Sequence, residues 1–121
     1  MRAAKAGSRA VSAWGIAARR DGRRVIVRLA EVAWIAADGN YCVLHRRGET
    51  HRRKEALASL LPRLPRDRFV RVSRSAAVNV DHVRELRPKS HGDATVLLDD
   101  GATLKVSRTR RPELARRQGR P

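Results

Sequence analysis

Turn sequences recur at short intervals along this chain and leave little room for long helices. Asp-Gly-Asn at 38–40, Arg-Gly at 47–48 and Asp-Gly at 100–101 each place a glycine where a positive φ is tolerated. Between these turns, short segments alternate apolar and polar side chains, which is the pattern of a strand with one buried face. The spacing therefore predicts a mostly β chain built from hairpins.

The apolar pattern predicts about seven or eight short strands and two helices. The clear change of period is at 54–64, where leucines at helical spacing predict a short internal helix that prolines end. A basic helix is expected over 107–117, with Ser107 or Thr109 as its cap. The strands are expected within 25–35, which holds two, at 41–46 and 51–53 as a hairpin, on both sides of 73–75, and at 83–88, 95–99 and 103–106.

The net charge of +16 on 121 residues is concentrated at the two ends. Residues 1–24 hold seven Lys or Arg against one acidic residue, and 105–120 hold seven against one, which leaves 14 basic and 10 acidic residues between them. Such an excess favours a polyanionic partner, although solvated basic tails would give the same count. We expect 1–22 to be a basic flexible tail or linker outside the core, 23–117 to form the domain and 118–121 to be disordered.

Several classes of protein are disfavoured by what the sequence lacks. Cys42 is the only cysteine, so no intrachain disulfide can form, which fits a reducing compartment. No apolar run approaches the roughly 20 residues that span a bilayer, and segment 10–18 is too short and lacks a cleavage site for a secretory signal. We therefore expect a cytoplasmic protein without membrane insertion.

Catalysis and metal binding are not indicated either. The four histidines do not follow a metal-ligand spacing, and a zinc site is not expected beside a single cysteine. No Gly-rich phosphate loop or carboxylate pair stands out, and Ser-Arg-Ser at 73–75 lacks the flanking glycines of a nucleophile elbow. We expect no enzyme activity, no metal and no cofactor.

The stretch RFVRVSRSAAVNVDHV at 68–83 combines the most hydrophobic run of the chain with a polar interruption. Val70 and Val72 share one face of a strand, and the alternation resumes after residue 76. Between the two halves, 73–75 is too polar for a core and is typical of an exposed loop on a rigid frame. Serine hydroxyls suit phosphate oxygens, and arginine suits phosphate or a guanine edge. The alternative is ordinary basic surface, and Asn79 is expected to bond local backbone.

Two longer stretches carry these parts in a recognisable order, namely WIAADGNYCVLHRRGETHRRKEALASLLPRLPRDRFVRVSRSAAVNVDHVRELR and, after it, LLDDGATLKVSRTRRPEL. Their order and spacing closely resemble the LytTR family of bacterial DNA-binding domains over about residues 25–117. That family shows an apolar strand, a GNY-type turn, a short helix ending near an LP…F.R.HRS..VN motif, and then DG…L.VSR. Ser73 is a departure, because the family often has histidine there, and it puts any contact of that histidine in doubt.

The resemblance implies an elongated stack of small antiparallel sheets with one short internal helix and a C-terminal helix, rather than a helix-turn-helix. In the family, loops from one side of this stack enter successive major grooves of duplex DNA and bend it. Carried over to this chain, the residues expected to bind DNA are Gly39, Asn40 and Tyr41 in a first loop, Ser73, Arg74 and Ser75 in a second, Ser107, Arg108, Thr109 and Arg110 in a third, and Lys89.

The expected function is sequence-specific binding of promoter DNA by a bacterial transcriptional regulator or response-regulator output domain, either alone or as a homodimer on repeated half-sites. The input stays open: the chain could be a fragment, a stand-alone regulator, or one controlled by a separate sensor or partner protein. The alternative function is a basic RNA-binding protein, although four aromatic residues offer little for base stacking.

Each expected contact also has a structural alternative. The polar residues of the first loop could serve only their own turn or the core. Arg74 could form a surface ion pair with Asp67 or Asp81, and Arg108 could pair with Asp100 or a helix end.

Overall fold

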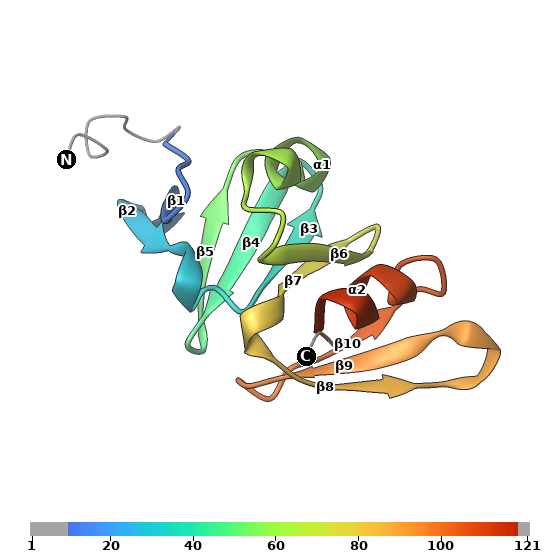
Figure 1. Cartoon of the computed structure of the whole chain (residues 1–121). Coiled ribbons are helices and arrows are strands. Elements are labelled where there is room, and N and C mark those ends of the chain that lie inside the picture. Colours follow the sequence, from blue (N-terminus) through green and yellow to red (C-terminus); the bar gives the residue numbers. More distant parts are fainter. Residues whose placement is uncertain (1–9, 119–121) are drawn as a thin grey trace.

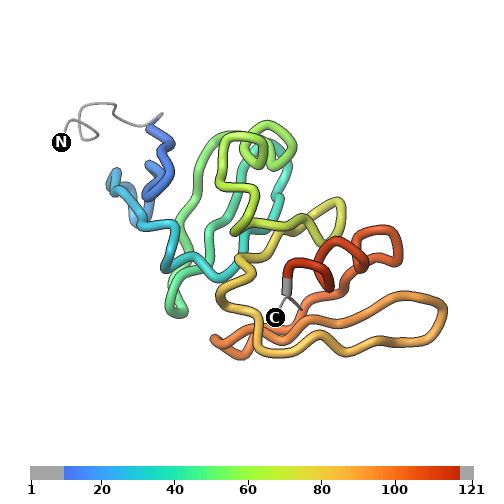
Figure 2. Tube along the Cα trace, in the orientation of Figure 1, coloured from blue at the N-terminus to red at the C-terminus, as the bar shows by residue number. Residues whose placement is uncertain are grey.

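The computed structural model describes residues 10–118, which form ten strands in two antiparallel sheets (Figure 1). The large sheet has the order β2-β1-β5-β4-β3-β7-β6, and the small sheet has the order β10-β9-β8. The strands are β1 (Gly15–Arg20), β2 (Arg23–Arg28), β3 (Trp34–Asp38), β4 (Tyr41–Arg46), β5 (Glu49–Arg53), β6 (Phe69–Ser73), β7 (Ala76–Asn79), β8 (Val83–Pro88), β9 (Ala94–Leu98) and β10 (Thr103–Val106). Figure 2 shows the two sheets side by side along the long direction of the molecule, so the predicted fold class is confirmed.

The centre of the large sheet is the β3–β4–β5 meander. Residues alternate along β4 as predicted, with Cys42 and Leu44 buried and their neighbours half-buried. The β1–β2 hairpin is attached more loosely, because its register with β5 is a single pair, Arg19 with Arg52. This hairpin therefore stands out from the sheet at the left of Figure 1.

Two hydrophobic clusters lie on this frame. The first is covered by α1 (Leu57–Leu60) and the following 3-10 turn (Leu61–Arg63), which bury Leu57 and Leu60 against β3 and its neighbours. The predicted helix over 54–64 is thus a single α-helical turn, because Pro62 lies at the start of the 3-10 turn and cannot continue the α-helical ladder.

The second cluster lies between the small sheet, β6 and α2 (Arg111–Gln118). Leu114 of α2 is fully buried there beside Val72, Val96 and Val106. The two sheets are also joined through the backbone, since the Ser107 amide donates to the Val72 carbonyl at 2.9 Å. This bond fixes the start of the α2 segment beside the end of β6.

Asn79, the last residue of β7, joins this strand to the segment between β2 and β3 from a fully buried position. Its Nδ2 donates to the carbonyls of Leu29 (3.3 Å) and Val32 (3.0 Å), and its Oδ1 accepts from the Asp81 amide at 3.0 Å. The leucine belongs to the 3-10 turn Leu29–Glu31 between β2 and β3. The structural role predicted for Asn79 is confirmed, but only the bond with Asp81 is to local backbone, and the other two reach a segment far away in the sequence.

The prediction that 1–22 lies outside the core is wrong for Gly15–Arg20, which forms β1. Ile16 is fully buried and Ala18 nearly so, because pairing with β2 places both side chains in the first cluster. The predicted disordered segment 118–121 lies outside the described residues, apart from Gln118, the last residue of α2. The expected tail at 1–9 also lies outside them.

Candidate nucleic-acid interface

The β6–β7 turn is held by its own side chains. Arg71 donates from Nε to the Ser73 carbonyl at 3.0 Å and from Nη2 to the Arg74 carbonyl at 2.7 Å, and Ser73 Oγ accepts from the Ser75 amide at 3.2 Å. A bulge between Arg71 and Ser73 turns the chain outward here. Within residues 10–118, the exposed Arg74 guanidinium has neither an ion pair nor a hydrogen bond. The alternative ion pair with Asp67 or Asp81 is therefore not formed, and Asp81 pairs with Arg68 at 3.5 Å.

The β3–β4 turn lies at the same end of the sheet. The Ala37 amide donates to the Ser75 carbonyl at 2.8 Å, and Ala36 is the register partner of Ala76, so the two turns are neighbours. Gly39 supplies a φ of +63°. Asn40 follows it, exposed to solvent, and no hydrogen bond of its side chain occurs in the described part of the chain.

The third loop, Ser107–Arg110, leads from β10 into α2. Its backbone folds back on itself, because the Ser107 carbonyl accepts from the amides of Arg110 (2.9 Å) and Arg111 (3.0 Å). The Arg108 side chain crosses Gly92 in the β8–β9 turn, where an added Cβ would lie 2.8 Å from Arg108 Cδ. Arg108 Nη1 donates to the His91 carbonyl at 3.5 Å, not to Asp100.

Two shallow hollows join the second loop, the third loop and the β8–β9 turn into one surface. A hollow of about 410 Å³ is lined by residues of both the second and third loops, and one of about 350 Å³ continues from the third loop to the β8–β9 turn. Ser107 and Asp93 line both hollows. In Figure 1 these three segments lie on the right-hand side of the molecule.

A family model described as the LytTr DNA-binding domain matches residues 22–118. The chain belongs to the LytTR family. The resemblance seen in the motifs is thereby confirmed, over almost the range expected from them. LytTR is a family of DNA-binding domains rather than of enzymes.

Curated relatives of this LytTR chain are named Sensory transduction protein LytT. The protein from Bacillus cereus is 31% identical over 91 residues, and the one from Bacillus subtilis is 26% identical over 90 residues. Each match covers 74% of this chain but 37% of the relative. A solved LytTr DNA-binding domain, from a Bacillus cereus protein described as a methyl-accepting/DNA response regulator, superposes with a TM-score of 0.80. It is 22% identical, covering 90% of this chain and all of that one, and the likeness concerns the fold.

Five expected LytTR contact residues line neither hollow, namely Gly39, Asn40, Tyr41, Lys89 and Arg110. The Tyr41 ring is half-buried under Arg52, whose guanidinium carbon is 4.6 Å from the ring centroid and whose Nη1 contacts Asp38 at 3.1 Å. Lys89 is exposed at the start of the β8–β9 turn, where its amide donates to the Asp93 carbonyl, but it lines neither hollow. The motifs did not predict Lys105, which lines one hollow. Its place on the polar face of the alternating segment TLKV could have indicated it.

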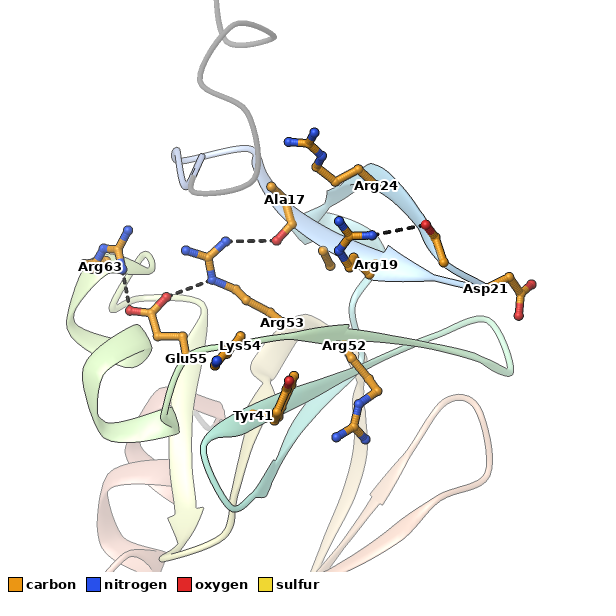
Figure 3. Close-up of a pocket in the computed structure, with 12 residues that line it drawn as sticks. Ala17, Arg19, Asp21, Arg24, Tyr41, Arg52, Arg53, Lys54, Glu55 and Arg63 are labelled. Carbon is orange, nitrogen blue, oxygen red and sulfur yellow. Dashed lines mark hydrogen bonds and ion pairs between the residues drawn. The ribbon is translucent and has the colours of Figure 1, made fainter.

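A larger hollow, of about 670 Å³, opens between the β1–β2 hairpin and the segment from β5 to α1 (Figure 3). Glu55 lies in its wall and accepts from Arg53 Nε at 2.8 Å, with Arg63 on its other oxygen. Burial alone would raise the pKa of Glu55, but hydrogen bonds from Arg53, Ser59 and Arg63 outweigh it and the pKa is lowered. The motif reading missed this hollow because it treated the hairpin as a tail.

Groups suited to catalysis or metal binding are not assembled in the described part of the chain. Within residues 10–118 no three His, Cys, Asp or Glu side chains are placed to hold a metal ion. Burial raises the pKa of the Cys42 thiol to about 11, and the thiol donates to the Glu55 carbonyl at 3.1 Å, which makes it a poor nucleophile. Across the same residues, no helix has the length and apolar character to cross a membrane.

Proposed function

We propose that this chain is the DNA-reading part of a bacterial transcriptional regulator, and that three turns on one side of its β framework enter successive major grooves of duplex DNA. The observation that supports this most is the row of turns at 39–40, 73–75 and 107–109. Backbone hydrogen bonds from Ala37 to Ser75 and from Ser107 to Val72 hold the row together. Loops held by a rigid sheet can present side chains to base edges without an inserted helix.

Within this row we assign base or phosphate contacts to the exposed side chains. Asn40 and Arg74 are uncommitted within the described residues, and Arg108 is held only by a long hydrogen bond to a carbonyl. Arginine can donate two hydrogen bonds to guanine, and asparagine can donate one to adenine N7 while accepting one from adenine N6. Gly39, Ser73, Ser75, Ser107, Thr109, Arg110 and Lys89 are assigned to phosphate or to shaping the loops, and Tyr41 to supporting the first loop.

Lysine and arginine neutralising phosphates would supply most of the affinity. If about six phosphates are engaged, log K should fall against log salt with a slope of about −5. The exposed aromatic surface needed for stacking on single-stranded RNA is small: Phe69 is buried, Trp34 stacks on His45, and Trp14 is the one large exposed aromatic within residues 10–118. Duplex DNA is therefore the favoured partner.

The test is selection of bound sequences from random duplexes by the wild type and by Asn40→Ala, Arg74→Ala and Arg108→Ala. Each variant should lose preference at a different position of the selected site. Arg84→Ala, which removes an exposed arginine of β8 at the end remote from Lys89, is the control and should select the wild-type site. Uniform weakening by all three loop variants, with unchanged preferences, would mean that the loops hold only the backbone.

The setting of the domain is also a proposal. The LytT relatives are longer than this chain, since the match covers 37% of their length. We propose that two copies bind repeated half-sites and that a separate sensor or partner supplies the input. Sedimentation of the complex with the selected duplex would give its stoichiometry, and one copy on a site with two repeats would contradict pairing.

A further inference from the structure

The hollow beside the β1–β2 hairpin is a strongly basic concave surface. Six of its lining residues are basic and two are acidic (Figure 3). The basic residues are Arg19, Arg24, Arg52, Arg53, Lys54 and Arg63, and the acidic ones are Asp21 and Glu55. Such an imbalance on a concave surface focuses a positive potential on the space outside it.

Part of this charge serves the fold. Figure 3 shows Glu55 between Arg53 and Arg63, and Arg53 also donates from Nη1 to the Ala17 carbonyl at 2.9 Å. Arg53 is 7% exposed, so its guanidinium joins β5 to β1 and is not offered to a ligand. Asp21 lies at the tip of the hairpin, where its ion pair is with Arg20.

Three of the six cations that line the hollow have no carboxylate partner among residues 10–118, whereas Arg52, Arg53 and Arg63 each have one. Arg24 and Lys54 have no side-chain interaction there, and Arg19 donates only to the Gly22 carbonyl at 3.1 Å. All three are exposed, on long side chains that no buried group fixes in place. Mobile surface cations suit the repeated charges of a polymer backbone better than one enclosed small anion.

The hollow adjoins the first DNA-reading turn. Arg53 is the register partner of Cys42, so Lys54 lies opposite the start of β4, next to Tyr41 and Asn40. Arg19 is one strand further on, as the partner of Arg52. Two strand spacings amount to about 10 Å, and a DNA strand advances about 3.4 Å per nucleotide along the axis. On a duplex that runs along the row of turns, the hollow therefore lies about three nucleotides beyond the bases assigned to Asn40.

We propose that this hollow binds the phosphodiester backbone of the duplex on the flank beyond the β3–β4 turn, through Arg19, Arg24 and Lys54. The proposal rests on the function proposed above and adds a fourth contact, one that does not read sequence. It makes the β1–β2 hairpin part of the DNA-binding surface. The length of duplex that the domain occupies therefore extends past its outermost base contact on one side.

The experiment compares Arg24→Gln/Lys54→Gln with the control Arg84→Gln/Arg116→Gln, which removes two exposed, unpaired cations from β8 and the last turn of α2. Dissociation constants are measured against salt on the wild-type selected duplex, at full length and shortened by about four base pairs on either flank. The flank beside the hollow is the one nearest the position at which Asn40→Ala loses preference.

On the long duplex the hollow variant should lower the salt slope by about 1.8, for two phosphates, while the control stays near the wild type. Shortening the flank beside the hollow should weaken the wild type more than the hollow variant, which keeps only Arg19 of the three cations. Shortening the other flank should affect both equally.

Equal slopes for the hollow variant and the control, or an effect that survives shortening of the nearby flank, would overturn this inference while leaving loop-mediated binding intact. If the wild type binds neither selected nor random duplex, the proposed function fails as well. The two failures are therefore distinguishable by the behaviour of the wild type alone.

Discussion

The buried Asn79 amide should contribute more to stability than its size suggests. Asn79→Leu keeps a side chain of similar volume but removes three hydrogen bonds, to Leu29, Val32 and Asp81. A hydrogen bond contributes about 1 kcal/mol net, and a buried polar group left without a partner costs about 1–3 kcal/mol. We expect the free energy of unfolding to fall by about 3–5 kcal/mol, out of the roughly 5–15 kcal/mol typical of a domain.

Urea denaturation followed by tryptophan fluorescence and by circular dichroism measures this loss, with coincident transitions as the check on two-state behaviour. Asn79→Asp provides a second test of the same hydrogen bonds. It retains the acceptor for Asp81 but turns an oxygen toward the carbonyls of Leu29 and Val32. Buried beside carbonyls, the new carboxyl should have a raised pKa, so Asn79→Asp should regain stability as pH falls below that value.

A stability of Asn79→Leu within about 0.5 kcal/mol of the wild type would refute the reasoning. It would mean that filling the space, rather than satisfying the backbone carbonyls, is what position 79 requires. Asn79→Asp that is as stable as the wild type at neutral pH would contradict it too.

Two further predictions concern the 3-10 turn Val80–His82, which connects β7 to β8, and the third loop. Burial lowers the pKa of His82, but hydrogen bonds to a backbone carbonyl (2.7 Å) and to Asp99 (2.9 Å) outweigh it and raise the pKa above 6.5. The stability that protonated His82 contributes should be fully present below pH 6.5 and lost as pH rises through the folded-state pKa. In pH-dependent urea denaturation, Asp99→Asn should reduce this difference and leave the part that is due to the Ala30 carbonyl. Gly92→Ala, at φ +84° and against Arg108, should cost about 1–2 kcal/mol and also weaken DNA binding. Gly101→Ala, at φ +92° with open space, should cost similar stability without that weakening, and equal DNA affinities would argue against the Arg108 contact.

Alternation and turn residues, which act over a few positions, were sufficient to predict most of the hairpins. The predicted ranges 83–88 and 103–106 coincide with β8 and β10, because local alternation and a Gly-containing turn at one end mark each of these strands. The two strands expected within 25–35 are β2 and β3, but β1, β5 and β4 lie between them in the sheet. Alternation predicts a strand, and it does not predict its neighbours.

β1 was missed for a related reason. GIAARR has weak strand propensity and buries mostly small side chains, so nothing local separates it from a basic tail. It becomes a strand through pairing with β2 and a single register pair with β5. Because the hairpin was missed, the basic hollow that it completes with Arg53 and Lys54 was missed as well.

Arg71 shows the same limit within the site. The sequence alone assigned no role to this arginine, which lies two residues before Ser-Arg-Ser. In the structure both of its bonds hold the turn that presents Arg74, which requires the bulge at the end of β6. Such a bulge is a property of strand pairing and leaves no reliable trace in the residue order.

By itself the amino-acid order determined the hairpins, the turn residues, the family and the side chains that the turns present, because turn chemistry and alternation act over a few residues. The tertiary structure alone decided that the turns at 39–40, 73–75 and 107–109 share one side, through bonds from Ala37 to Ser75 and from Ser107 to Val72. It also decided which arginines are committed to carboxylates and carbonyls. The row of turns, and the bond of Arg53 to Ala17, depend on groups 30 or more residues apart, which only long-range strand pairing brings within hydrogen-bonding distance.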